Sequence, residues 1–130
     1  MFGRVTNMTR CLVIESRSDE RNRTVDLLQD LGFDVRGSQS VDEAITFLDV
    51  EVPDVVLVEQ LSEAKQTAAA LLRIREAARR KGKAPLLLLC SEARDPQAIG
   101  AAIMHGASEC LIKPFDGAVL ENKLKQCGLV

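Results

Sequence analysis

Aromatic residues are scarce in this chain: its 130 residues include four phenylalanines but no tryptophan and no tyrosine. Few rings are therefore present on which a nucleic-acid base can stack. The formal net charge of −2 supplies no overall positive field that would attract a phosphate backbone. We therefore expect no DNA partner.

Long apolar runs are also absent. No stretch approaches the roughly 18 consecutive apolar residues of a membrane-spanning helix, and the first residues lack the apolar core of a secretion signal. We expect no membrane partner and a cytoplasmic location. Residues 1–9 carry no periodic pattern, so we interpret them as a disordered extension and residues 10–130 as one domain.

Spacings typical of metal sites and disulfides are missing. The only histidine, His105, precedes a glycine at an expected helix end, where an imidazole interacts favourably with the helix dipole. No two cysteines form a Cys-x-x-Cys pair, and most lie in or beside apolar runs, where a reduced thiol packs as a small hydrophobic side chain. The cysteines are Cys11, Cys90, Cys110 and Cys127. We expect reduced thiols and no metal site.

Sequence motifs of common enzyme classes are missing as well. The chain contains no glycine-rich dinucleotide loop, no P-loop and no nucleophile elbow. We therefore do not expect an enzyme.

Short apolar runs alternate with segments of helical periodicity. The runs are apolar on successive residues, as expected for strands that helices cover on both faces, except for a shorter alternating run at 33–35. The four continuous runs are 11–14, 55–58, 86–90 and 110–112. Strict alternation of strands and helices predicts an α/β fold: a doubly wound, five-stranded parallel sheet of order 2-1-3-4-5, which is flavodoxin-like.

Helix signals support this assignment. Ser40, Asp95 and Asp116 are expected N-caps, the first within a capping box and the second followed by proline. Glycines 32, 82, 106 and 128 follow the expected helix ends. The residues expected to face the sheet are Val41, Ala44, Ile45, Leu48, Ala64, Ala68, Leu71, Leu72, Ile74, Ile99, Ala102, Ile103, Val119, Leu120 and Leu124.

Polar side chains follow the predicted strands at their carboxyl ends. Glu15 and Ser16 follow the first strand, Glu59 ends the third, and Ser91 and Lys113 end the fourth and fifth. In a doubly wound sheet these ends border the crevice where ligands bind. We therefore expect two carboxylates, a hydroxyl and an ammonium group at one site.

From about residue 10 to 128 the chain resembles the receiver domain of two-component response regulators, of the single-domain chemotaxis and cell-cycle type. The stretches that carry the resemblance are CLVIES, PDVVLVE, LLLLCSE and, most specifically, HGASECLIKPF with its lysine and proline. In this family the Lys-Pro bond is usually cis. The resemblance implies signalling by phosphorylation of an aspartate.

Two positions depart from the family pattern. By resemblance, Glu59 occupies the place of the phosphoacceptor aspartate, Glu15 that of one metal-binding acid, and Ser16 that of the second, more direct metal ligand. The longer side chain of Glu59 displaces its oxygens, and Ser16 contributes no negative charge to a Mg²⁺ site. Ser16 is equally well explained as a turn or N-cap residue. We expect no cofactor, with Mg²⁺ binding weak or lost.

The remaining site positions concern the switch of the family. Ser91 matches the hydroxyl that binds the phosphoryl group, Lys113 the lysine that pairs with it, and Cys110 stands where an aromatic ring usually moves on activation. Without that ring we expect one fixed conformation. We further expect an ion pair between Glu59 and Lys113 that partly mimics the phosphorylated state.

The expected function is therefore that of a stand-alone pseudo-receiver that acts through protein contacts. Its partner would be a histidine kinase, a phosphotransferase or output machinery, bound through the last strand and its flanking helices at about residues 95–127. One alternative is a receiver that is still phosphorylated slowly.

A second alternative rests on a basic cluster formed by Arg73, Arg75, Arg79 and Arg80, followed by lysines 81 and 83. Such a cluster suits the outer face and carboxyl end of a helix, where positive charge complements the helix dipole. It also suits an anion patch for an acidic partner or a cyclic dinucleotide such as cyclic di-GMP, because arginine binds phosphate through two parallel hydrogen bonds.

Overall fold

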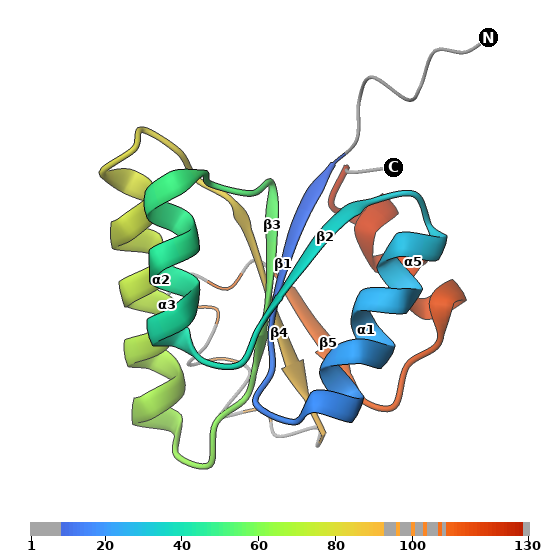
Figure 1. Ribbon diagram of the computed structural model, residues 1–130. Helices are drawn as coiled ribbons and strands as arrows, with labels where there is room; N and C mark the ends of the chain where they lie inside the picture. Colours follow the sequence, from blue (N-terminus) through green and yellow to red (C-terminus); the bar gives the residue numbers. More distant parts are fainter. Residues whose placement is uncertain are drawn as a thin grey trace, which may run out of the picture.

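The computed structural model describes residues 9–92, 96, 100, 103, 107 and 109–128. Within them, five parallel strands form one sheet in the order β2-β1-β3-β4-β5 (Figure 1). The strands are β1 (Arg10–Ile14), β2 (Asp34–Ser38), β3 (Val55–Glu59), β4 (Leu86–Ser91) and β5 (Glu109–Ile112). The helices with described bounds are α1 (Ser18–Asp30), α2 (Val41–Val50), α3 (Ala64–Arg79) and α5 (Gly117–Gln126). The predicted fold class and strand order are confirmed.

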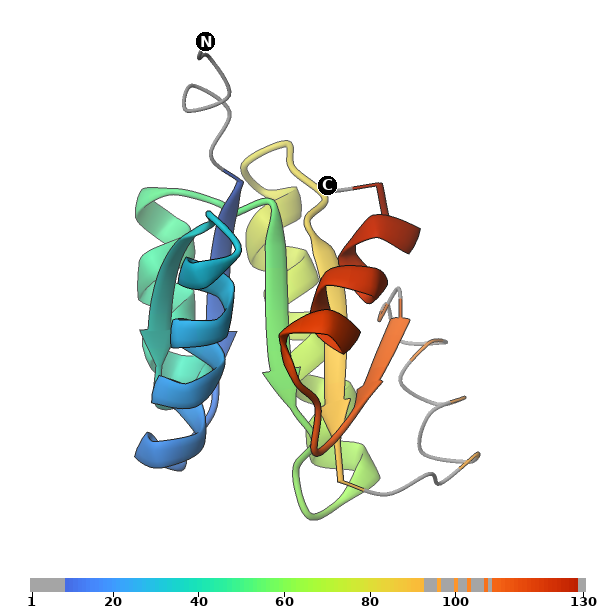
Figure 2. The same cartoon turned by 90° about the vertical axis from the view of Figure 1, so that its right-hand side faces the viewer.

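Helices cover both faces of the sheet. Helices α2 and α3 lie on one face, and α1 and α5 lie on the other (Figures 1 and 2). Along β1 the side chains alternate between the two layers: Leu12 and Ile14 belong to the core under α2 and α3, and Cys11 and Val13 to the core under α1 and α5. Both faces are therefore apolar, which explains the continuous hydrophobic runs in the sequence.

Two predicted N-caps are confirmed. The Ser40 hydroxyl accepts a hydrogen bond from the Glu43 amide at 3.1 Å, and the Asp116 carboxylate accepts one from the Val119 amide at 2.9 Å. Gly32 and Gly82 adopt φ values of 96° and 71° after α1 and α3, a left-handed conformation that side chains disfavour. The turns that return the chain to β2 and β4 are therefore fixed locally.

Three residues expected to face the sheet are instead exposed. Leu72 on α3 is 46% exposed, Val119 on α5 is 47% exposed and Ile103 is 50% exposed. Consecutive helical residues point about 100° apart, so only one of two neighbouring apolar residues can face the centre of the sheet. Leu71 and Leu120 take the buried positions next to Leu72 and Val119.

Several predictions lie outside the described residues. These are the extension before residue 9, the helix start at Asp95, the sheet-facing positions Ile99 and Ala102, and the positions of His105 and Gly106. The side chain of Ala64 also lies outside the described part of the chain. Among the helices that are described, none combines the length and apolar character needed to cross a membrane.

Candidate functional site at the carboxyl ends of the strands

Strand register brings the two predicted carboxylates together. Strands β1 and β3 are neighbours with Ile14 opposite Val58, so Glu15 and Glu59 follow side by side at the same edge of the sheet. Adjacent strands lie about 4.8 Å apart, and the two carboxyl groups are in hydrogen-bonding contact. A hydrogen bond between two carboxyl groups requires a proton on one of them.

Glu59 is held by the residue that replaces the second acid. The amide of Ser16 donates a hydrogen bond to Oε2 of Glu59 at 2.9 Å, and its hydroxyl donates to the same oxygen at 3.2 Å. Burial, together with the neighbouring charge of Glu15, raises the pKa of Glu59 above its ordinary value despite these bonds. Ser16 is not the N-cap of α1; that position belongs to Arg17, without a side-chain cap bond.

Glu15 is the best-paired acid of the site. Its Oε1 atom accepts a hydrogen bond from Nζ of Lys113 at 2.7 Å, and its Oε2 atom accepts one from the amide of Arg17 at 3.1 Å. The Glu15 side chain is only 5% exposed and that of Lys113 only 15%. Burial alone would raise the pKa of Glu15, but the hydrogen bonds from Glu59 and Lys113 outweigh it and lower that pKa.

The predicted ion pair between Glu59 and Lys113 is wrong. Lys113 instead donates to Glu15 and, at 2.7 Å, to Oε2 of Glu20 on the first turn of α1. Glu59 lines a cavity of about 390 Å³ on the α2 side, whereas Lys113 lines one of about 440 Å³ on the α1 side. The ammonium group is therefore directed toward α1, where two carboxylates compensate its burial.

Arg17 is a second cation at the site, and the sequence did not identify it as a counter-ion of the acids. Arg17, in the turn after β1, donates from Nη2 to Glu20 and to Glu92, both at 2.9 Å, and its Nε lies 3.5 Å from Oε2 of Glu15. Three carboxylates thus surround one guanidinium. The available signal was the SRSDE segment directly after the first strand, where Arg17 and Glu20 are three residues apart.

The charge of the site differs from a count of the predicted residues alone. Glu15, Glu59 and Lys113 sum to −1; adding Glu20, Glu92 and Arg17 gives four acids and two cations, which sum to −2 when all are ionised. The raised pKa of Glu59 lowers this charge when that carboxyl is protonated. Negative charge therefore remains, but Oε1 of Glu15 already accepts a hydrogen bond from the Lys113 ammonium group, and Oε2 accepts one from the Arg17 amide.

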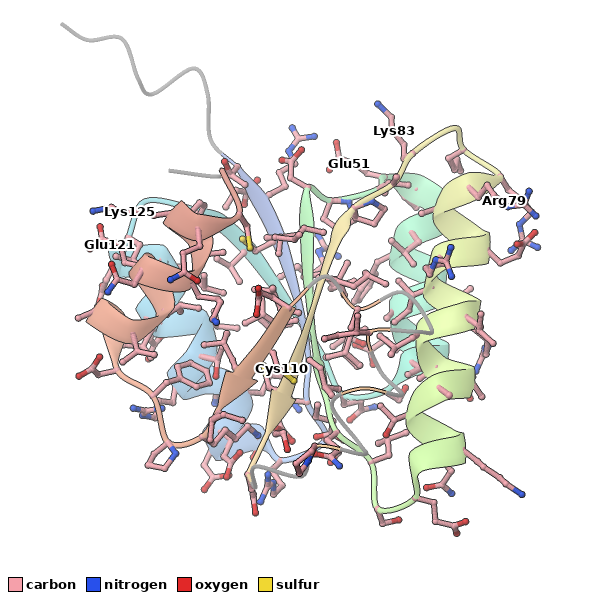
Figure 3. The ribbon with its side chains drawn as sticks, turned by 180° about the vertical axis from the view of Figure 1, so that it is seen from behind. Glu51, Arg79, Lys83, Cys110, Glu121 and Lys125 are labelled. Carbon is pink, nitrogen blue, oxygen red and sulfur yellow. The ribbon has the colours of Figure 1, made fainter. Side chains whose placement is uncertain are left out.

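The predicted switch positions have local partners. The Ser91 hydroxyl donates to the side-chain oxygen of Gln60, the residue after β3. Lys113 and Pro114 are joined by a cis peptide bond, and the Lys113 amide donates to the Ser91 carbonyl at 2.7 Å. Cys110 lies on β5 with a partly exposed side chain (Figure 3). The side chain at position 110, where the resemblance implies a mobile aromatic ring, is therefore small.

The cysteines are free, as expected. Burial raises the pKa of the Cys11 and Cys90 thiols to about 12, and it also raises the pKa of Cys110 and Cys127. Thiols with raised pKa values stay protonated at neutral pH and are weak nucleophiles.

The four arginines of the predicted anion patch do not form one site. Arg73 forms an ion pair with Asp42 of α2 at 2.7 Å and lines the cavity beside Glu59. Arg75 and Arg79 line a different pocket near the carboxyl end of α3. Arg80 is exposed beside that pocket and is not among its lining residues. The patch is therefore split between two faces of α3.

The raised pKa of Glu59 gives a testable pH dependence. The pKa of such a carboxyl is higher in the folded state than in the unfolded state, where it is near 4.5. Its contribution to stability is fully present below the unfolded pKa and is lost as the pH rises through the folded pKa. Glu59→Gln keeps a neutral side chain of the same size. We expect the variant to melt a few degrees above the natural protein at pH 7, with the difference vanishing below about pH 4. Equal melting temperatures at pH 7 would contradict this prediction, because they would mean that ionised Glu59 does not destabilise the fold.

The comparisons with known proteins show the fold. No protein-family model matches the chain, and no curated protein matches it significantly. Among solved structures, the chemotaxis protein CheY4 of Vibrio cholerae superimposes with a TM-score of 0.82 at 20% identity, covering 92% of this chain and 98% of that one. A response regulator from Thermotoga maritima gives 0.82 at 24% identity, covering 92% and 97%.

A two-component response regulator from Clostridium difficile is similar as well, with a TM-score of 0.80 at 20% identity over 92% of this chain and 94% of that one. These neighbours have the strand order found here. The chain therefore has the fold of CheY-like response-regulator receiver domains.

Proposed function

We propose that the chain is a receiver-like module of two-component signalling that acts through protein contacts, without phosphorylation of Glu59 and without enzymatic activity. The observation that carries this proposal is the pairing of the acidic residues with internal cations. Lys113 binds Glu15 and Glu20 at 2.7 Å, and Arg17 bridges Glu20 and Glu92 at 2.9 Å. The groups that would bind a metal and a phosphoryl group already bind each other.

The donor set does not suit Mg²⁺, the ion that the resemblance implies for a receiver. Mg²⁺ requires octahedral geometry from oxygens with free lone pairs, and it gives up its own water reluctantly. Both Glu15 oxygens accept hydrogen bonds, and Oε2 of Glu59 accepts two from Ser16. A metal ion would have to displace Lys113 or Arg17, so we propose that its affinity is weak or lost.

Mimicry of the phosphorylated state is not part of the proposal. A phosphoryl mimic would have to bind Lys113, whereas Glu59 binds Ser16 and the carboxyl group of Glu15. The Ser91 hydroxyl donates to Gln60. With a small side chain at Cys110, no described element offers two alternative packings, so we propose a single conformation.

The proposed partner is a signalling protein such as a histidine kinase, a phosphotransferase or output machinery. Its docking face would include β5 and α5, within residues 95–127. Within the described part of this face, Val119 is 47% exposed and Lys123 pairs with Glu109 at 3.3 Å. We propose Val119 as an apolar contact of this face, with the Lys123–Glu109 pair at its polar rim.

The direct test is incubation with acetyl phosphate and Mg²⁺ followed by intact-mass measurement. We expect no phosphoryl adduct, because the longer side chain of Glu59 displaces its oxygens and the proposal gives Mg²⁺ weak affinity or none; a displacement of about 1 Å alone costs roughly a hundredfold in rate. A stable adduct that disappears in Glu59→Gln would contradict the proposal and favour a slowly phosphorylated receiver.

A further inference from the structure

A second pocket lies far from the acidic site. It is bordered by the last turns of α3 and the start of β4, so the length of β4 separates Leu86 in the pocket from Ser91 by about 17 Å. Figure 3 shows Arg79 and Lys83 at this end of the molecule, beside the carboxyl end of α3. A ligand here would act independently of the proposed function at Glu59.

The pocket combines an apolar wall with a basic rim. Its volume is about 760 Å³, within the range of ligand pockets. Leu72, 46% exposed, and Leu86, partly buried, line it together with Arg75, Arg79 and Lys83. Leu72 and Leu86 together form an apolar wall beside the basic rim, and an apolar side chain packed against this wall would remove its surface from water.

The rim carries positive charge that is only partly compensated within the chain. Arg79 pairs with Glu76 at 2.8 Å. The side chains of Arg75 and Lys83 have no hydrogen bond or ion pair within the part of the chain that is described. Three cations against Glu76 leave a local charge of +2, on a chain whose net charge is −2. The positive charge is therefore concentrated at this pocket.

We propose that the pocket binds an acidic segment of a partner protein, with an apolar side chain packed against Leu72 and carboxylates bound by Arg75 and Lys83. The positive rim favours a segment that carries negative charge, and the exposed Leu72 favours a segment that also contains an apolar side chain. None of the described lining residues is aromatic, so a nucleobase would find no ring on which to stack. A peptide therefore fits better than a cyclic dinucleotide.

The test uses a fluorescein-labelled peptide of sequence EDELLEDE and a control, EDESSEDE, in which serine replaces leucine. We expect the leucine peptide to bind more tightly than the serine peptide and to weaken as salt is added. Amide NMR shifts on binding should concentrate in residues 72–86. Shifts concentrated elsewhere, or equal affinity for both peptides, would overturn the proposal.

Variants of the pocket make the test specific. Arg75→Glu with Lys83→Glu should weaken the leucine peptide by at least about tenfold, because two attractive charges become repulsive. Leu72→Ser should bring its affinity close to that of the serine peptide. Lys65→Glu, a charge reversal at the other end of α3, should leave binding unchanged. An equal loss in Lys65→Glu, or displacement of the peptide by cyclic di-GMP at equimolar concentration, would overturn the proposal, the latter in favour of a nucleotide site.

Discussion

Replacing Lys113 by alanine is expected to lower the free energy of unfolding by about 2–3 kcal/mol. The ammonium group is the partner of two carboxylates, Glu15 and Glu20, each at 2.7 Å. The Glu15 side chain is 5% exposed, so removal of the Lys113 ammonium group leaves a buried carboxylate with one cationic partner fewer. Urea unfolding of both proteins measures the difference, and Lys125→Ala, an exposed lysine on α5, serves as the matched control with an expected change near zero.

The pH dependence of this effect is fixed by the direction of two pKa shifts. The pKa of Lys113 is raised, because its bonds to Glu15 and Glu20 outweigh the opposing effect of burial. The contribution of Lys113 to stability is therefore fully present below the ordinary pKa of 10.5 and is lost above the folded pKa. The pKa of Glu15 is lowered, so its contribution is present above 4.5 and is lost as the pH falls through the folded pKa. The loss in Lys113→Ala should therefore be constant between about pH 6 and 9. A variant as stable as Lys125→Ala would refute the assigned pairing.

Restoring two aspartates is expected to restore Mg²⁺ binding. In Ser16→Asp with Glu59→Asp, a carboxylate replaces the hydroxyl that now donates to Glu59 at 3.2 Å. Two neighbouring carboxylates repel each other, and a divalent ion between them relieves the repulsion. With a dissociation constant of about 0.1–1 mM, 10 mM Mg²⁺ would stabilise the variant by about 1.4–2.7 kcal/mol.

Thermal melts with and without Mg²⁺ measure this effect. The natural protein should show almost no shift, because Ser16 contributes no negative charge to a Mg²⁺ site. The matched control is Ser18→Asp with Glu59→Asp, which adds the same charge at an exposed position of α1, outside the acidic site. A magnesium-dependent shift in the control or in the natural protein would show that the substitution at Ser16 does not explain the loss of the metal.

The sequence was sufficient for the arrangement of the sheet and for the meeting of Glu15 and Glu59 at its carboxyl edge. Continuous apolar runs predicted strands covered on both faces, and the caps at Ser40 and Asp116 lie where expected. Parallel strands end at a common edge, so Glu15 and Glu59 had to meet once the strand order was known.

The pairing within the site depended on geometry that the sequence does not contain. Lys113 had several carboxylates within reach. It pairs with Glu15 and Glu20 because of the way α1 packs against the end of β1. Arg17 could not be recognised as a counter-ion before its distances to Glu20 and Glu92 were known. Similarly, periodicity marked both Leu71 and Leu72 as apolar, but only packing decided which one is buried.

A crystal structure of the natural protein grown with Mg²⁺ and beryllofluoride tests the central claim most directly. The pairing of Glu15 with Lys113 and Arg17 predicts that both salt bridges persist, with neither ion bound at this edge of the sheet. Beryllofluoride attached to Glu59, with Mg²⁺ coordinated by Glu15 and Lys113 turned toward the fluorines, would contradict it.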